Sequence, residues 1–225
     1  MSKTRWGILG TGGICHSFAT CLPDAGNAEL VAVGSRTQEK ADAFGKEFNI
    51  PNCHGSLEAF VADPEIDAIY VGSPHHMHRD HAIMCMEAGK AVLCEKPFAI
   101  NSTQAREMVE CARKNNVFLM EAMWTRFLPA LDKLRELIAA GEIGELRMVM
   151  SDFGFQAQCD PESRLFAPEM GGGGLMDVGV YSVSLATMLL GEAIEIASLM
   201  EPAATGVDGQ AGIVIKHKTG MSVIA

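Results

Sequence analysis

The sequence has little positive charge. Only 18 of its 225 residues are lysine or arginine, against 28 aspartates and glutamates, and the formal net charge is -10. No cluster of basic residues offsets this acidic excess. Because phosphate backbones and anionic membranes repel a surface of this kind, we expect neither nucleic acid nor a membrane as a partner.

The sequence also lacks paired cysteines and any obvious targeting segment. Its seven cysteines are scattered, odd in number and never spaced as CxxC, which excludes a disulfide framework and a zinc knuckle. "MSKTRWGILG" leads directly into a strand-like segment, and no stretch is expected to reach the length of a membrane span. These features predict a soluble, cytoplasmic protein.

Aromatic residues are scarce as well, at 6%, whereas the chain has 23 glycines, 14 methionines and 48% hydrophobic residues. This balance is typical of α/β proteins rather than of disordered ones. In the first half, short apolar runs alternate with helical patterns, which predicts βαβ units and a mostly parallel sheet. The predicted strands are 6–10, 29–35, 68–73, 91–95 and 117–121, with helices between them, including one over 101–114 that Asn101 caps.

The pattern changes after about residue 122. A helix with leucines on one side precedes the strand-like segment 146–155 and four consecutive glycines, and segment 212–225 alternates like an antiparallel hairpin. This hairpin stops in mid-strand, so we expect the chain to be shorter than the full fold requires. The predicted fold is an α/β Rossmann domain over 1–122, followed over 123–225 by a partial α+β domain with a mostly antiparallel open sheet.

The segment "GTGGIC", residues 10–15, follows the first predicted strand and begins the first helix. In a dinucleotide-binding unit, Gly10 permits the tight turn, while Gly12, Gly13 and Ile14 bring backbone N–H groups to the pyrophosphate. Cys15 stands where such motifs have a third glycine, and it is small enough for close packing. An ordinary glycine-rich turn is the alternative, but the strand before and the helix after favour nucleotide binding.

The second predicted strand ends in Ser35, Arg36 and Thr37. NAD-binding units usually carry an acidic residue here for the ribose hydroxyls, whereas two hydroxyls and a guanidinium suit a 2′-phosphate. We therefore predict NADP as the cofactor, with NAD as the alternative. Arg36 as a solvated surface residue remains the competing interpretation.

Four further segments, "SPHHMH" (73–78), "CEKPF" (94–98), "EAMWTRFLPA" (121–130) and "GGGGLMDVGVYSVSLA" (171–186), resemble the Gfo/Idh/MocA oxidoreductases. The similarity is greatest to the branch that contains dimeric dihydrodiol dehydrogenase, xylose dehydrogenase and glucose-fructose oxidoreductase. It extends over essentially the whole chain, with the motifs in the family's order and spacing.

This resemblance implies three catalytic residues. Lys96 would lie beside the nicotinamide, where a cation stabilises the alkoxide-like charge that develops as hydride moves. Tyr181, where many relatives have histidine, would exchange a proton with the substrate, and Asp177, one helical turn earlier, would orient substrate and lysine.

The resemblance also implies further cofactor contacts, from Ser73, Pro74, His75, His78, Glu95 and Arg126. His78 has a packing role as its alternative, and Arg126 an interdomain ion pair. A metal site at the histidines of 75–81 is disfavoured, because no carboxylate or cysteine completes a ligand set. Trp124 and Phe127 are predicted to be interface core.

The predicted function is NADP(H)-dependent hydride transfer between the nicotinamide and a secondary alcohol or carbonyl of a sugar, polyol or vicinal diol. A non-catalytic NAD(P)-binding sensor is the alternative. The expected partners are the small-molecule substrate and, if the second domain is complete, a second copy of the chain.

Overall fold

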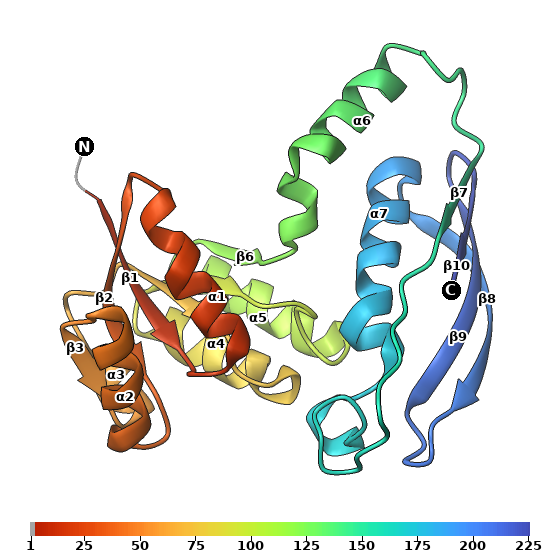
Figure 1. Ribbon diagram of the computed structural model, residues 1–225. Coiled ribbons are helices and arrows are strands. Elements are labelled where there is room, and N and C mark those ends of the chain that lie inside the picture. The colour runs from red at the N-terminus through yellow and green to blue at the C-terminus, as the bar shows by residue number, and fades with distance from the viewer. Residues whose placement is uncertain (1–2) are drawn as a thin grey trace. The chain divides into compact units, whose positions relative to one another are not determined.

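The computed structural model describes residues 3–225, which form two compact units that divide between Ala122 and Met123 (Figure 1). The first unit contains a six-stranded, all-parallel sheet in the order β3-β2-β1-β4-β5-β6. This order is that of a dinucleotide-binding Rossmann fold and confirms the predicted fold class. Its strands are β1 (Thr4–Leu9), β2 (Ala28–Gly34), β3 (Asn52–His54), β4 (Ala68–Val71), β5 (Ala91–Cys94) and β6 (Leu119–Glu121).

The helices of the first unit begin and end at residues that suit those positions. The Asn101 side chain accepts a hydrogen bond from the Gln104 N–H at 3.0 Å, as predicted, and Ser56 caps α3 in the same way. Gly89, which follows α4, has a φ of 77°, a conformation that favours glycine. The helices are α1 (Gly13–Cys21), α2 (Gln38–Phe48), α3 (Leu57–Val61), α4 (His78–Glu87) and α5 (Ser102–Asn115), with 3-10 turns at Leu22–Asp24 and His75–Met77.

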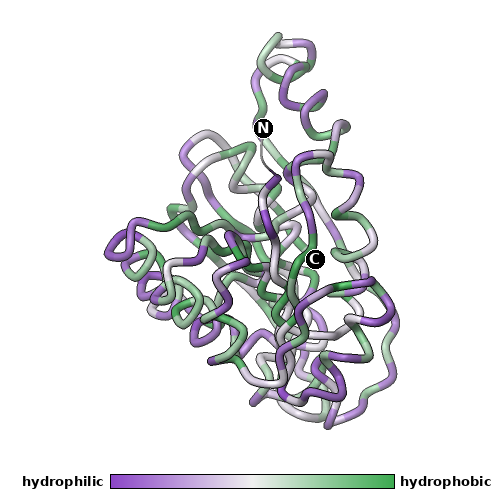
Figure 2. Tube along the Cα trace, turned by 90° about the vertical axis from the view of Figure 1, so that its left-hand side faces the viewer, coloured by the Kyte–Doolittle hydropathy of each residue, from purple (hydrophilic) through white to green (hydrophobic). Residues whose placement is uncertain are grey.

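Apolar side chains cover both faces of this sheet, as expected for an all-parallel sheet. Ile69 and Tyr70 are neighbours on β4, yet Ile69 packs with Met86 and Met108, whereas Tyr70 packs with Ile8. Successive strand residues point to opposite faces, so the two clusters lie on opposite sides of the sheet. Figure 2 shows hydrophobic and hydrophilic stretches alternating along the Cα trace.

The second unit contains a four-stranded sheet in the order β7-β10-β9-β8, with β7 (Met148–Ser151), β8 (Ala193–Pro202), β9 (Asp208–His217) and β10 (Met221–Ile224). β10 and β9 form the predicted antiparallel hairpin, whereas β10 and β7 are parallel. Helix α7 (Val180–Leu190) covers one face, where Ala186 packs on Ile213, Ile215 and Ile224. The remaining elements are α6 (Pro129–Ala139), the 3-10 turns Trp124–Phe127 and Pro168–Met170, and a π-helical turn, η5 (Leu175–Gly179).

The opposite face of this second sheet is apolar and uncovered within the unit. Met150, Val223, Val214 and Ala197 form one row across the four strands, because they are paired in register. Met150 is 74% exposed, and every residue of β8 is exposed.

The segment Pro168–Leu190 corrects one expectation from the sequence. It is long and apolar enough to cross a membrane, judged by length and composition alone, although we expected no stretch of that length. A core helix meets the same criteria, and Ala186 and Leu190 of this segment are buried in the second unit. The four glycines hid its length, because glycine interrupts a helical pattern.

Candidate active site

The predicted residues of the first unit lie at one edge of its sheet. They follow the ends of β1, β2, β4 and β5, and the carboxyl ends of parallel strands share an edge. The strand order reverses between β1 and β4, and ligands of open α/β sheets bind outside such a switch point.

The loop after β1 has the space and the backbone geometry that a pyrophosphate requires. Gly10 has a φ of 118°, and a Cβ atom there would lie 3.1 Å from the Gly72 carbonyl oxygen. Cβ atoms at Gly12 and Gly13 would meet nothing within 4 Å, so this surface is open. Helix α1 begins at Gly13, and its first N–H groups are those that bind phosphate oxygens in such folds. Ile14 is 44% exposed beside them.

Cys15 replaces the third glycine by fitting against β4. Its side chain is fully buried, with the Sγ atom 3.5 Å from the Gly72 carbonyl oxygen. Burial raises the pKa of the Cys15 thiol to about 12, so the group is not a thiolate at neutral pH. Cys15 therefore has a packing role, as its position in the motif predicted.

The segment after β2 presents a cation next to two hydroxyl groups. Ser35 is buried and its N–H donates to the His54 carbonyl oxygen at 3.0 Å, whereas Arg36 is exposed. Thr37 caps α2 by accepting a hydrogen bond from the Lys40 N–H. The exposed Arg36 is therefore available to a ligand at this edge of the sheet, and the choice between NADP and NAD stays a prediction.

The segment after β4 contains a buried hydroxyl and a buried histidine. The Oγ atom of Ser73 is buried without a hydrogen-bond partner among residues 3–225, which fits a polar group that awaits a ligand. Pro74 is exposed and His75 is buried. His78 is fully buried, with its ring nitrogens 2.8 Å from the carbonyl oxygens of Ser73 and Pro97. His78 thus ties this segment to the turn that follows β5.

That turn carries Glu95 and Lys96. Glu95, predicted as a cofactor contact, is only 7% exposed, and its carboxylate accepts hydrogen bonds from the Tyr70 hydroxyl at 2.5 Å and from the Lys96 N–H at 3.1 Å. Burial raises the pKa of Glu95, partly offset by these two donors. The Glu95 carboxylate therefore holds the backbone N–H of Lys96 in place. Lys96 itself is half-buried at the sheet edge.

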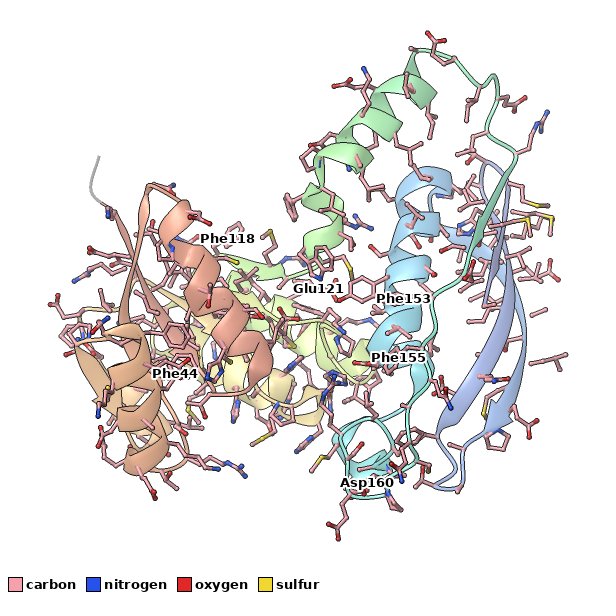
Figure 3. The ribbon with its side chains drawn as sticks, in the orientation of Figure 1. Phe44, Phe118, Glu121, Phe153, Phe155 and Asp160 are labelled. Atoms are coloured by element: carbon pink, nitrogen blue, oxygen red, sulfur yellow. The ribbon has the colours of Figure 1, made fainter. Side chains whose placement is uncertain are left out.

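In the second unit, Tyr181 lies on α7 between two aromatic rings. Its hydroxyl oxygen accepts a hydrogen bond from the Trp124 indole N–H at 3.1 Å, and the Phe153 ring centroid is 5.5 Å from its own. Figure 3 shows Phe153 beside α7. Trp124 and Phe127, predicted as interface core, are 53% and 65% exposed, and their burial at an interface stays a prediction. The indole N–H of Trp124 can donate a hydrogen bond but cannot accept one, so the hydroxyl proton of Tyr181 points away from it.

Asp177 lies in the π-helical turn η5, where we expected a regular helix. It is 7% exposed, and its carboxylate accepts a hydrogen bond from Arg164 at 2.8 Å. Asp208 of β9 supports the same turn by accepting the Leu175 N–H at 2.5 Å. A Cβ atom at Gly173 would collide with the Asp208 carboxylate, so a glycine is required there. π-helical turns are frequent at functional sites.

Arg126 forms hydrogen bonds within the second unit. Its Nε and Nη2 atoms donate to the hydroxyl and carbonyl oxygens of Ser184 at 2.8 and 3.2 Å. These contacts join the Trp124–Phe127 turn to α7. The guanidinium is exposed, and its contact with a cofactor stays a prediction.

Three residues of this arrangement were missed in the sequence: Tyr70, Arg164 and Asp208. Asp177 also borders a cavity of about 980 Å³ in the second unit, whose wall includes Phe153, Phe155 and Leu165. Neither Lys96 nor Tyr181 lines this cavity, so its position alone does not identify it as the substrate site.

Comparison with known proteins adds independent findings. Residues 4–123 match the model of an oxidoreductase family with an NAD-binding Rossmann fold, and residues 131–225 match the GFO/IDH/MocA C-terminal domain. Trans-1,2-dihydrobenzene-1,2-diol dehydrogenases from Xenopus laevis and Mus musculus are 41% and 38% identical over 95% and 96% of this chain. The chain spans about two thirds, 66%, of the length of each.

A solved structure of another oxidoreductase is also similar to this chain. The aldose-aldose oxidoreductase from Caulobacter crescentus superposes with a TM-score of 0.92 at 26% identity, covering 99% of this chain and 70% of its own. The strand order, the glycine loop and the Glu95-Lys96 turn agree with these matches, which confirm the resemblance drawn from the sequence motifs. The chain belongs to the Gfo/Idh/MocA oxidoreductase family.

Proposed function

We propose that the protein is an NADP(H)-dependent oxidoreductase that transfers hydride between the nicotinamide and a secondary alcohol or carbonyl of a sugar, polyol or vicinal diol. The 41% identity to a diol dehydrogenase over 95% of the chain carries this proposal. The similarity to an aldose-aldose oxidoreductase supports the inclusion of sugars.

The residues at the sheet edge fit a dinucleotide. Gly12 and Gly13 would receive the pyrophosphate, Arg36 the 2′-phosphate, and the buried Ser73 hydroxyl a polar group of the cofactor. The exposed Arg36, in place of an acidic residue, favours NADP over NAD.

The proposed chemistry divides between a cation and a proton donor. The bound nicotinamide supplies or accepts the hydride. Lys96 stabilises negative charge on the reacting oxygen, and its backbone is anchored by Glu95. Tyr181 exchanges the proton of that oxygen, with its hydroxyl oriented by Trp124. Asp177, held by Arg164, orients the substrate.

The test is reduction of NADP and NAD by a panel of diols, polyols and sugars. Lys96→Ala and Tyr181→Phe should each lower turnover by about 100-fold or more, the size expected for loss of acid–base or electrostatic catalysis. Lys114→Ala, which removes a lysine at the end of α5, is the matched control and should leave turnover unchanged. Nucleotide binding without turnover of any substrate would instead support the sensor alternative.

We propose that a second copy of the chain covers the apolar outer face of the second sheet. Met150, Val223, Val214 and Ala197 form one row across the four strands, in which Val223 is half-buried and the other three are exposed, and Leu199 is 84% exposed beside them. Patches of this kind mark interaction surfaces. Sedimentation analysis should give a dimer that Met150→Asp dissociates, and a monomeric wild type would contradict the proposal. A cytoplasmic location is likewise proposed, and cell fractionation tests it.

A further inference from the structure

Two loops meet at the carboxyl ends of β2 and β3, directly beside the proposed 2′-phosphate site. The register pairs Gly34 with His54, and the Ser35 N–H continues this pairing by donating to the His54 carbonyl oxygen at 3.0 Å. The segment Ser35–Thr37 is therefore positioned by the segment that follows β3, residues 53–55.

Gln38, the first residue of α2, joins the same two segments through its side chain. Its Nε2 group donates to the Cys53 carbonyl oxygen and to the Asp42 carboxylate, each at 2.8 Å, and its Oε1 atom accepts the Gly55 N–H at 2.9 Å. Two acceptors on one side and one N–H donor on the other determine how the amide is oriented.

The backbones are also in close contact here. A Cβ atom at Gly55 would lie 2.6 Å from the Gln38 nitrogen and 2.7 Å from its Cα atom. Only glycine permits this approach, which brings the Gly55 N–H within reach of the Gln38 amide. The contact holds the start of α2, and the Arg36-Thr37 segment before it, in one position.

We infer that Gln38 is a positioning residue that determines the preference for NADP over NAD. By bonding residues 53 and 55, it fixes the loop that carries Arg36, so less loop ordering is needed when the guanidinium binds a 2′-phosphate. NAD lacks that phosphate, so its affinity does not depend on this loop to the same extent. The inference rests on the proposed NADP preference.

The experiment measures the dissociation constants of NADPH and NADH by nicotinamide fluorescence for the wild type, Gln38→Leu and Arg36→Ala. Gln38→Leu keeps the approximate size of the side chain and removes all three hydrogen bonds. It should weaken NADPH binding about 5- to 10-fold, the effect of losing one or two hydrogen bonds, and change NADH binding less than twofold. In the double variant with Arg36→Ala, the Gln38 substitution should add little, because it acts through that arginine.

Gln38→Glu provides a second variant that keeps the acceptor for Gly55 but lacks both donors and adds a negative charge near the phosphate. It should lower the preference for NADPH further than Gln38→Leu does. Equal weakening of both nucleotides, or full additivity with Arg36→Ala, would overturn the inference and leave Gln38 a purely structural residue. A wild type without any preference for NADPH would instead overturn the proposed cofactor, which is a separate result.

Discussion

The hydroxyl group of Tyr70 donates a 2.5 Å hydrogen bond to the carboxylate of Glu95, and both side chains are buried. Tyr70 also stacks on Phe18, with ring centroids 3.9 Å apart. The pair joins β4 to the turn after β5, since the tyrosine belongs to the strand and the glutamate begins the turn. Lys96 is therefore attached to the core of the first unit through its neighbour in the sequence.

The chain contains only two tyrosines, which allows a matched pair of substitutions. Tyr70→Phe removes one of the two hydrogen-bond donors to the buried Glu95 carboxylate, so it should lower the free energy of unfolding by about 1–3 kcal/mol. Tyr181→Phe loses a hydrogen bond from the exposed Trp124 and should lower it by less than about 1 kcal/mol. Urea denaturation measures both, and equal effects would contradict the anchoring role of Tyr70.

The acid sensitivity of the fold should depend on Asp63. Burial alone would raise the pKa of Asp63, but hydrogen bonds from the Glu65 N–H at 2.8 Å and from His54 at 2.9 Å outweigh it and lower the pKa below the usual value near 3.8. A carboxyl group whose pKa is lower in the folded protein than in the unfolded chain stabilises the fold at any pH above its pKa in the unfolded chain. This stabilisation is lost as the pH falls through its pKa in the folded protein.

Between pH 7 and about 3, the free energy of unfolding of the wild type should therefore fall more steeply than that of Asp63→Asn, mostly below about pH 4. Asp63→Asn should also be less stable at pH 7. Urea midpoints across this range provide the measurement, and Asp24→Asn, at an exposed aspartate, is the control. Parallel curves for the wild type and Asp63→Asn would refute the prediction.

Thiol labelling should separate the cysteines by burial. Cys21 and Cys159 are exposed, whereas Cys15, Cys85 and Cys94 are buried. Burial raises the pKa of Cys15 and of Cys85 to about 12, and it raises the pKa of Cys94 well above its usual value. Iodoacetamide should modify Cys21 and Cys159 at least 100-fold faster than the three buried cysteines. The reagent reacts with thiolates, and the buried thiols have raised pKa values and are shielded from it. Mass spectrometry of timed samples tests this, and early modification of Cys15 would contradict its packing role.

Gly173 offers a test of the turn that carries Asp177. Its φ is 122°, and a methyl group there would collide with the Asp208 carboxylate, which accepts the Leu175 N–H. Gly173→Ala should therefore destabilise the protein by about 2 kcal/mol or more and lower turnover. Gly154→Ala, where a Cβ atom meets nothing within 4 Å, should have little effect. Similar melting temperatures for the two variants would contradict this account.

Much of the first unit could be predicted because its signals are local. Alternation of strand and helix patterns, the Gly10–Cys15 segment and the Asn101 cap each occupy a few consecutive residues. Strand β3 was missed because three half-buried residues, Asn52–His54, are too few to show a period. The positions of these segments at one sheet edge then follow from the parallel topology.

The contacts that the sequence did not predict join residues far apart in the chain. Tyr70 and Glu95 are separated by 25 positions and meet only because β4 and β5 are adjacent. Arg164 reaches Asp177 from an irregular segment without any periodic pattern. The hydrogen bond that the Trp124 indole N–H donates to the Tyr181 hydroxyl joins residues 57 positions apart, so no local pattern predicts it.

The pairing of β7 with β10 has a consequence for synthesis. All six strands of the first sheet have been made once residue 121 is complete, so this unit can close while the rest is still being translated. Strand β7, at residues 148–151, pairs with residues 221–224, so it stays without this partner until those residues have been made. Strands β8 and β9 can already pair with each other during this interval, whereas β7 presents an open strand edge for longest.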